Sequence, residues 1–155
     1  MALMAWETHV KRMNTLLGKL TDAQLQDETS PGRNSGTYLL GHLTAVNDFM
    51  LPLFGLGERL YPELETIFIT NPDKSGLDKP SAAELRAYWA NVTNTLNDHF
   101  SKMSADDWFS RHTSVSEADF AKEPYRNKLN VLLNRTNHQA YHWGQMAFLD
   151  KKASE

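Results

Sequence analysis

The feature that most constrains this chain is the spacing of its apolar residues, which recur at steps of three and four in separate stretches. These stretches cover residues 3–20, 36–55, 81–103 and 128–149. Such spacing places apolar side chains on one face of an α-helix, and no stretch shows the two-residue alternation of a β-strand. The pattern predicts an all-α fold, a four-helix bundle with long connections between helices 2 and 3 and between helices 3 and 4.

Residues that favour helix ends support these limits. Ser35 and Asn127 can each cap the helix that follows them. Ser81 and Glu84 form the S-x-x-E pattern of a capping box at the start of the third helix. Pro52 removes one helical hydrogen bond, so we expect the second helix to kink or end near it.

The two connections differ in character. Residues 55–80 are rich in glycine and proline, yet they also carry bulky apolar side chains, and a short helix is expected at about 60–68. This composition is typical either of a structural crossover or of a lid that packs over an opening. Residues 104–108 resemble a second capped turn, and residues 109–126 show no clear period. We therefore expect the second connection to lack a regular helix.

Composition limits the kinds of protein this chain can be. With 155 residues, 41% of them hydrophobic, it can bury one core, and we expect a single domain at 1–150 with a frayed tail at 151–155. A net charge of −3 argues against a nucleic-acid partner. No secretory signal and no run of about 18 apolar residues is found, so we expect no membrane partner and a cytoplasmic location. The absence of cysteine excludes disulfides and thiolate ligands.

Polar side chains occupy helical positions where core residues are expected. His42 falls on the apolar stripe of the second helix, which also carries Leu39, Val46, Phe49 and Leu53. Taken alone, this position is more typical of a hydrogen-bonded core histidine than of a ligand. The inner stripe of the last helix is largely polar, and it reads Val131, Arg135, His138, His142 and Gln145. Either this face forms a functional site, or it faces solvent and a second set of residues faces the core. The second set is Leu132, Leu133, Ala140, Ala147 and Phe148.

The histidines in these stripes have the spacing of metal ligands. His138 and His142 are four residues apart, so their side chains lie on one helical face, about 5–6 Å apart at Cβ. Together with His42 they offer three neutral imidazoles and leave one position open, which suits zinc, nickel or iron. Gln139 stands where a zincin has its catalytic glutamate, and neither histidine has the glutamate three residues earlier that di-iron bundles require. Of the other histidines, His9 is expected at the surface or at the core boundary, His99 in a salt bridge or exposed, and His112 in solvent.

Two segments together resemble the DinB superfamily, also called the DinB/YfiT-like group. They are Tyr38-Leu39-Leu40-Gly41-His42-Leu43 and His138-x-x-x-His142-x-Gly144-Gln145. The resemblance spans nearly the whole chain, including the order and length of the helices. It implies a four-helix bundle in which His42, His138 and His142 hold a divalent metal. It also implies that Gly144 and Gln145 pack near these ligands or contact them.

The resemblance implies one activity and leaves an alternative. The activity is a metal-dependent S-transfer from a low-molecular-weight thiol such as bacillithiol, mycothiol or glutathione, with the thiol activated as a thiolate. For that activity, Arg135 is expected either to bind a carboxylate of the thiol or of the electrophile or, as the alternative, to form a salt bridge at the helix surface. Tyr141, Trp6 and Trp89 are candidates for lining the pocket, although aromatic residues at helical spacing are more often core residues. The alternative is a non-catalytic metal-binding module of the DNA-damage-inducible stress-response type, or a bundle without metal. A homodimer is the expected oligomer.

Overall fold

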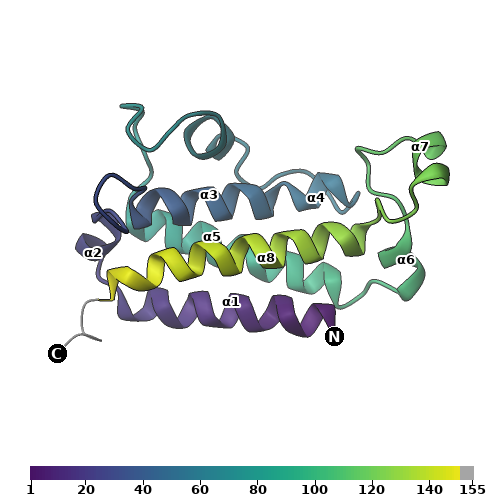
Figure 1. Ribbon diagram of the computed structural model, residues 1–155, viewed down its shortest axis with the longest axis horizontal. Helices are drawn as coiled ribbons and strands as arrows, with labels where there is room; N and C mark the ends of the chain where they lie inside the picture. Colours follow the sequence, from purple (N-terminus) through teal and green to yellow (C-terminus); the bar gives the residue numbers. More distant parts are fainter. Residues whose placement is uncertain (151–155) are drawn as a thin grey trace.

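Residues 1–150, the part of the chain that the computed structural model describes, are helical and contain no strand. The long helices are α1 (Ala2–Lys19), α3 (Gly36–Asp48), α5 (Ala82–Phe100) and α8 (Lys128–Met146) (Figure 1). The shorter elements are α2 (Asp22–Gln26), α4 (Met50–Leu53), the π-helix η1 (Thr66–Thr70), α6 (Ala105–Phe109), α7 (Glu117–Lys122) and the 3-10 helix η2 (Ala147–Leu149). The all-helical class predicted from the periodicity is thus confirmed, and the tail expected at 151–155 lies outside the described residues. None of the described helices is long and apolar enough to cross a membrane.

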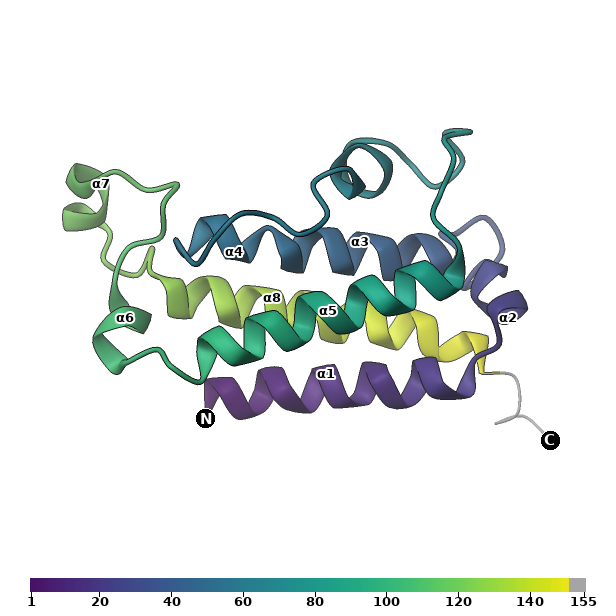
Figure 2. The same ribbon diagram turned by 180° about the vertical axis from the view of Figure 1, so that it is seen from behind.

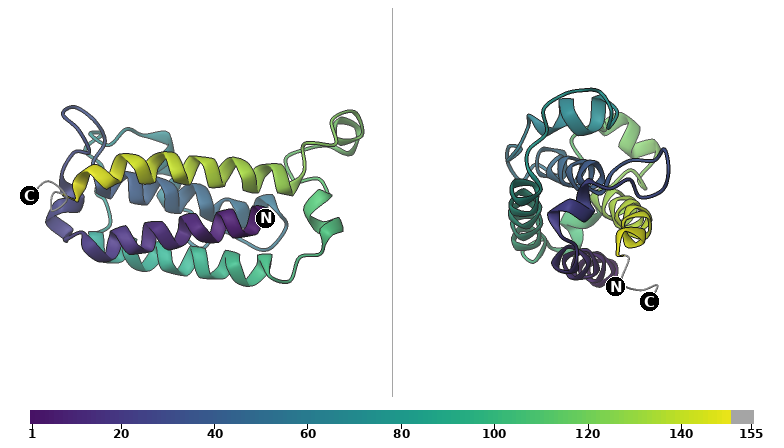
Figure 3. Two further views of the ribbon diagram at one scale, coloured as in Figure 1. Left: turned by 60° about the horizontal axis from the view of Figure 1, so that its bottom comes forward. Right: turned by 90° about the vertical axis from the view of Figure 1, so that its left-hand side faces the viewer.

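The long helices lie side by side, and each is covered by its neighbours on its apolar face. α1 packs against α8, and α3 packs against both α5 and α8. The same arrangement is seen from behind in Figure 2. The end-on view in Figure 3 shows that the connection from α4 to α5, which includes η1, lies outside α3. This connection therefore covers the outer side of one of the helices that carry the predicted ligands.

The core between the long helices is aliphatic and aromatic. Trp6 and Trp89 are 0% and 1% exposed, and each indole N–H donates to an asparagine on a neighbouring helix. The acceptors are Asn97 at 2.9 Å for Trp6 and Asn14 at 2.8 Å for Trp89. Both tryptophans are therefore satisfied core residues, which is the more common role of aromatic residues at helical spacing, and they are not candidates for lining a pocket.

The helix starts follow the caps expected from the sequence. The side chains of Ser35 and Asn127 accept hydrogen bonds from the amides of Tyr38 and Asn130. Ser81 and Glu84 form the reciprocal capping box at the start of α5. The capped turn expected at residues 104–108 is present as α6. These local signals were sufficient because a cap depends on only three or four consecutive residues.

The second predicted helix, 36–55, is shorter in the structure. α3 ends at Asp48, and a separate turn, α4, follows from Met50 to Leu53. Pro52 explains the break, because its ring clashes with the carbonyl four residues earlier, at Asp48, and it has no N–H to donate. Phe49 stands at the junction and is 37% exposed, so it leaves the inner stripe on which it was expected.

Two short helices lie in segments for which the apolar spacing predicts no helix. α2 begins at a capping box formed by Thr21 and Gln24, a variant of the S-x-x-E pattern that was visible in the sequence. α7 lies within residues 109–126 and is capped by Ser116. It contains no buried residue, so it has no apolar period by which a sequence could reveal it.

The connection from α4 to α5 is attached to α3 at both of its ends. At the end nearest α4, the carboxylate of Asp48, which is 0% exposed, accepts hydrogen bonds from the backbone amides of Leu60 and Tyr61. Each of these bonds is 2.9 Å long. A buried carboxylate with two backbone donors is well satisfied, and it holds the connection against the last turn of α3.

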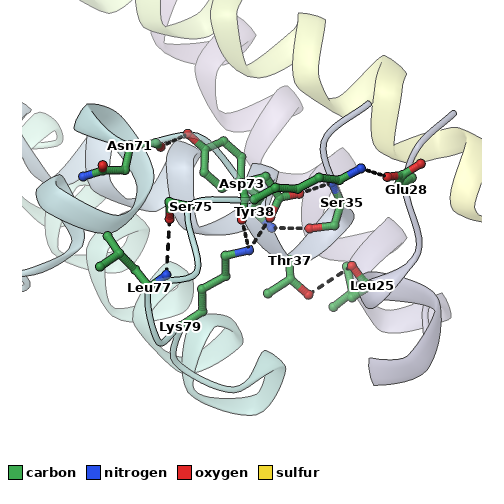
Figure 4. Close-up of polar contacts among 11 residues, drawn as sticks. Leu25, Glu28, Ser35, Thr37, Tyr38, Asn71, Asp73, Ser75, Leu77 and Lys79 are labelled. Atoms are coloured by element: carbon green, nitrogen blue, oxygen red, sulfur yellow. Dashed lines mark hydrogen bonds and ion pairs between the residues drawn. The ribbon is translucent and has the colours of Figure 1, made fainter. Parts of the chain in front are cut away.

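At the other end the attachment involves the first turn of α3 (Figure 4). The buried carboxylate of Asp73 accepts from the amide of Ser35 at 2.7 Å and pairs with the ammonium of Lys79. Burial raises the pKa of Asp73, but the bonds from Lys79 and Ser35 outweigh it and hold that pKa below its usual value. The hydroxyl of Tyr38 donates to the carbonyl of Asn71 at 2.7 Å. The whole connection is therefore fixed along α3.

Candidate metal centre

The three histidines predicted as ligands meet between α3 and α8. Nε2 of His138 lies 3.2 Å from Nε2 of His42 and 2.9 Å from Nε2 of His142. One nitrogen from each ring falls within 4.8 Å of the other two, and all three residues are half-buried. Three nitrogens that each bind one ion at about 2.0–2.1 Å are themselves roughly 3 Å apart. The spacing therefore fits a single divalent ion.

The outer nitrogens of two of the rings are held by hydrogen bonds. Nδ1 of His42 lies 2.8 Å from the backbone carbonyl of Phe68, and Nδ1 of His142 lies 2.7 Å from Oε1 of Gln145. An oxygen of this kind can only accept, so each Nδ1 carries the proton and each Nε2 presents a lone pair to the cluster. This tautomer is the one that a metal-ligating imidazole needs.

A single hydrogen on His138 cannot satisfy the lone pairs of both neighbouring histidines, whereas one metal ion could accept all three Nε2 atoms. His42 and His142 both direct lone pairs toward His138, whose Nε2 carries at most one hydrogen. Burial, followed by the neighbouring charges of His142, His42 and Arg135, lowers the pKa of His138 to about 4. Burial also lowers the pKa of His142, partly offset by its bond to Gln145. At neutral pH both rings are uncharged and ready to bind a cation.

The residue before His42 determines how closely η1 approaches α3. A Cβ on Gly41 would stand 2.5 Å from the ring of Phe68, a distance that non-bonded carbon atoms do not adopt. Glycine therefore creates the space in which the ring of Phe68 lies, with 0% of that residue exposed. At Gly144 on α8 a Cβ would meet nothing within 4 Å, so no close approach requires glycine at that position.

The polar stripe of α8 lies beside the core, and neither sequence-based alternative described it fully. The buried residues of α8 lie on a different face of the helix, and they are Leu132, Thr136, Gln139 and Met146. The stripe with the two histidines is half-buried and turns toward α3. Leu133 and Phe148, candidates for an alternative core face, are 43% and 78% exposed. The helix is therefore rotated so that histidines reach the cluster while one edge of the site stays accessible.

Three further residues were singled out on this face, and they lie in different environments. Arg135, one turn before His138, is half-buried, makes no hydrogen bond or ion pair within residues 1–150, and its Nε is fully shielded. Tyr141 is 63% exposed, and its ring lies 5.1 Å from that of His142. Gln145 contacts His142 directly and donates to the Tyr141 hydroxyl at 3.3 Å. Arg135 is thus a cation without a protein partner beside the histidines.

The sequence did not reveal one contact of the histidine cluster and one hydrogen bond close to it. The carbonyl of Phe68 is a backbone atom and carries no residue signature, although the apolar run of residues 67–69 marked the segment as packed. Gln139 was considered only as a missing glutamate, yet it is fully buried and bonds to Asn47 at 3.2 Å.

The remaining histidines stay outside the cluster. They are His9, His99 and His112. All three are half-buried, so the expectation of a boundary position holds for His9. His99 and His112 are less exposed than expected. Burial, with a smaller effect of a nearby arginine, lowers the pKa of both His9 and His112.

Comparison with known proteins gives information on the fold and on the family of this chain. A solved structure described as a conserved protein from Enterococcus faecalis superposes with a TM-score of 0.67, covering 97% of this chain and 93% of that chain. The two sequences are 15% identical, so the likeness concerns the fold alone. A search of curated proteins gave no significant match. The sequence pattern of the DinB superfamily matches residues 5–146, nearly the full length. The chain therefore belongs to the DinB superfamily.

Proposed function

We propose that this protein is a DinB-type four-helix bundle that binds one divalent metal ion through His42, His138 and His142. The observation that carries the proposal is the convergence of three Nε2 atoms, two of which present lone pairs because their Nδ1 atoms are hydrogen-bonded elsewhere. Zinc and nickel suit three imidazoles in this arrangement, and iron(II) is the alternative. The open coordination position is what a ligand or substrate requires.

The charge of the site favours an anionic partner. Three neutral imidazoles leave the full charge of a bound ion uncompensated, and the cluster contains no carboxylate within the described residues. The unpaired guanidinium of Arg135 adds a further positive charge one turn away. A thiolate fits such a site, because a bound divalent ion lowers the pKa of a coordinating thiol.

We therefore propose a metal-dependent S-transferase for a low-molecular-weight thiol of the bacillithiol, mycothiol or glutathione type. Arg135 binds a carboxylate of the thiol or of the electrophile through its planar guanidinium. Gln145 holds the His142 ring in its ligating tautomer. The exposed ring of Tyr141 borders the accessible edge of the site. The homodimer and the cytoplasmic location expected from the sequence remain predictions.

The test begins with the metal and continues with the thiol. Protein purified without a histidine tag is analysed for bound metals next to the His142→Ala variant, in which one ligand is missing. The metal-loaded protein is then incubated with an electrophile and with each of the three thiols. We expect thiol–electrophile adducts to form at a rate that depends on metal occupancy and falls in His142→Ala.

The same experiment distinguishes the S-transferase from the alternative, a non-catalytic metal-binding module. A protein that binds one metal ion, loses it in His142→Ala, and forms no adduct with any of the thiols is a non-catalytic metal-binding module. A protein that binds no divalent ion under any condition contradicts the metal centre itself.

A further inference from the structure

The connection between α4 and α5 follows α3 in a regular antiparallel register. As the connection advances, each attachment to α3 moves back by a corresponding number of residues. The pairs are Asp48 with Leu60 and Tyr61, His42 with Phe68, Tyr38 with Asn71, and Ser35 with Asp73. The contact to His42 is the central one of this series, so the segment that covers α3 also holds a metal-binding side chain.

The π-helix η1 supplies an unused carbonyl at this central point. A helix leaves its last carbonyls without intrahelical donors, and Phe68 lies within the last turn of the five-residue η1. Its oxygen is therefore free to accept from Nδ1 of His42 at 2.8 Å. Short π-helical segments are frequent at functional sites, where they redirect backbone groups.

The side chain of the same residue determines the position of that carbonyl. The Phe68 ring occupies the space above Gly41 and also packs on Tyr38, at 5.7 Å between ring centroids. A methyl group on residue 41 would meet three ring atoms at 2.5–2.6 Å and would force η1 outward. Because the ring and the carbonyl belong to one residue, such a shift would lengthen the bond to His42.

We propose that Gly41 and Phe68 form a seat that positions His42 for metal binding, so that the placement of η1 and the occupancy of the metal centre are coupled. The inference rests on the proposed metal site. With η1 seated, His42 is held in the tautomer and ring orientation that directs Nε2 toward His138. With η1 displaced, His42 can rotate or exchange tautomers, and the ion loses one preorganised ligand. Metal binding in turn favours the seated conformation, by linkage.

The experiment compares two glycine-to-alanine changes on the ligand-bearing helices. Gly41→Ala should unseat η1, whereas Gly144→Ala is the matched control because a methyl there meets no atom within 4 Å. We expect Gly41→Ala to weaken zinc binding, measured by competition with a chromophoric chelator, by about 10- to 100-fold. Gly144→Ala should bind zinc like the parent protein. The absorption spectrum of the cobalt(II)-loaded protein should change only in Gly41→Ala.

A second substitution distinguishes positioning from general damage. Phe68→Val removes the three ring atoms that the new methyl would meet, so the double variant Gly41→Ala/Phe68→Val should regain most of the lost zinc affinity. If Gly41 served only general stability, the folded Gly41→Ala variant would bind zinc with unchanged affinity and an unchanged cobalt spectrum, and that result would overturn the proposal. A parent protein that binds no metal would instead contradict the proposed function.

The parent protein gives an independent readout even if Gly41→Ala does not fold. The nitrogen-15 chemical shifts of the His42 ring in the metal-free protein report which nitrogen carries the proton. We expect Nδ1 to be protonated, with the proton protected by the Phe68 carbonyl. A His42 ring protonated at Nε2, or one that averages between both tautomers, would refute the seat.

Discussion

Asn47 on α3 donates its side-chain amide to Oε1 of Gln139 on α8 at 3.2 Å, and both residues are buried, at 1% and 0% exposure. The bond links the two helices that carry the histidine cluster, one turn away from His42 on α3 and next to His138 on α8. It therefore helps to fix how these helices lie against each other near the histidine cluster.

Removing one partner of this pair should be costly. Asn47→Leu leaves the buried Gln139 amide with no partner at either end, since its Nε2 already lacks one within residues 1–150, and this costs about 1–3 kcal/mol of the free energy of unfolding. The double variant Asn47→Leu/Gln139→Met should cost less than the sum of the two single changes, because no polar group is left unpaired. Urea denaturation of the metal-free variants measures the coupling, and strictly additive costs would show that the bond contributes nothing.

Each histidine of the cluster should be required for metal retention. Replacing His42, His138 or His142 by alanine removes one of three ligands, so we expect the bound metal per chain to fall from about one to near zero. His99→Ala is the control, since His99 lies on α5 and outside the cluster. Elemental analysis after gel filtration gives the answer, and equal metal loss from His99→Ala would point to non-specific binding.

Metal removal should destabilise the folded protein. An ion that binds only the folded state, present at about a thousandfold excess over its dissociation constant, adds roughly 4 kcal/mol to the free energy of unfolding. A chelator should remove that increment and lower the melting temperature, while the His142→Ala variant should show no response. Differential scanning calorimetry with and without added zinc provides the measurement.

Arg135 should affect substrate binding without affecting the metal. Arg135→Met removes the guanidinium but keeps much of the aliphatic stem, and a lost charged hydrogen bond of about 1.5–3 kcal/mol corresponds to a KM increase of roughly 10- to 150-fold. Arg135→Lys should recover only part of it, because an ammonium cannot bind a carboxylate with two parallel bonds. Steady-state kinetics and metal analysis of the same samples are compared, and a loss of metal would assign Arg135 a structural role.

The stability of the metal-free protein should depend on pH through His138. Its pKa is lowered to about 4 in the folded state, against about 6.5 in an unfolded chain. Between these values the unfolded state takes up a proton that the folded state does not, so stability falls as the pH decreases. The contribution of His138 is complete above pH 6.5 or so and is lost progressively toward pH 4. Urea denaturation from pH 7 to pH 4.5 should show this decline, with a smaller slope in His138→Gln.

The features of this structure that depend on residues close in sequence could be predicted from the sequence. Ser35, Ser81 and Asn127 marked the helix starts because a cap needs only a side chain and an amide two or three residues ahead. The pairing of His138 with His142 followed from helical spacing in the same way. Bringing His42 to them required the family resemblance, since periodicity alone does not say which helices face each other.

The features that depend on contacts between residues far apart in sequence, or on backbone atoms, could not be predicted from the sequence. The rotation of α8 places Gln139 in the core and Arg135 at its edge, and this choice is made by packing against α1 and α3. The hydrogen bond from His42 to Phe68 ends on a carbonyl that every residue type possesses. Pro52 predicted that the second helix would kink or end near it, but the helix ends earlier, at Asp48. The reason is that the proline ring clashes with the carbonyl four residues before it.

The antiparallel register along α3 restricts where the length of this chain can change. An insertion or deletion between Tyr61 and Phe68 would put one attachment out of step with α3, either at Asp48 or at His42. α7 itself has no such constraint, since it buries no residue. Length variation among related chains should therefore accumulate around α7, away from the attachments along α3.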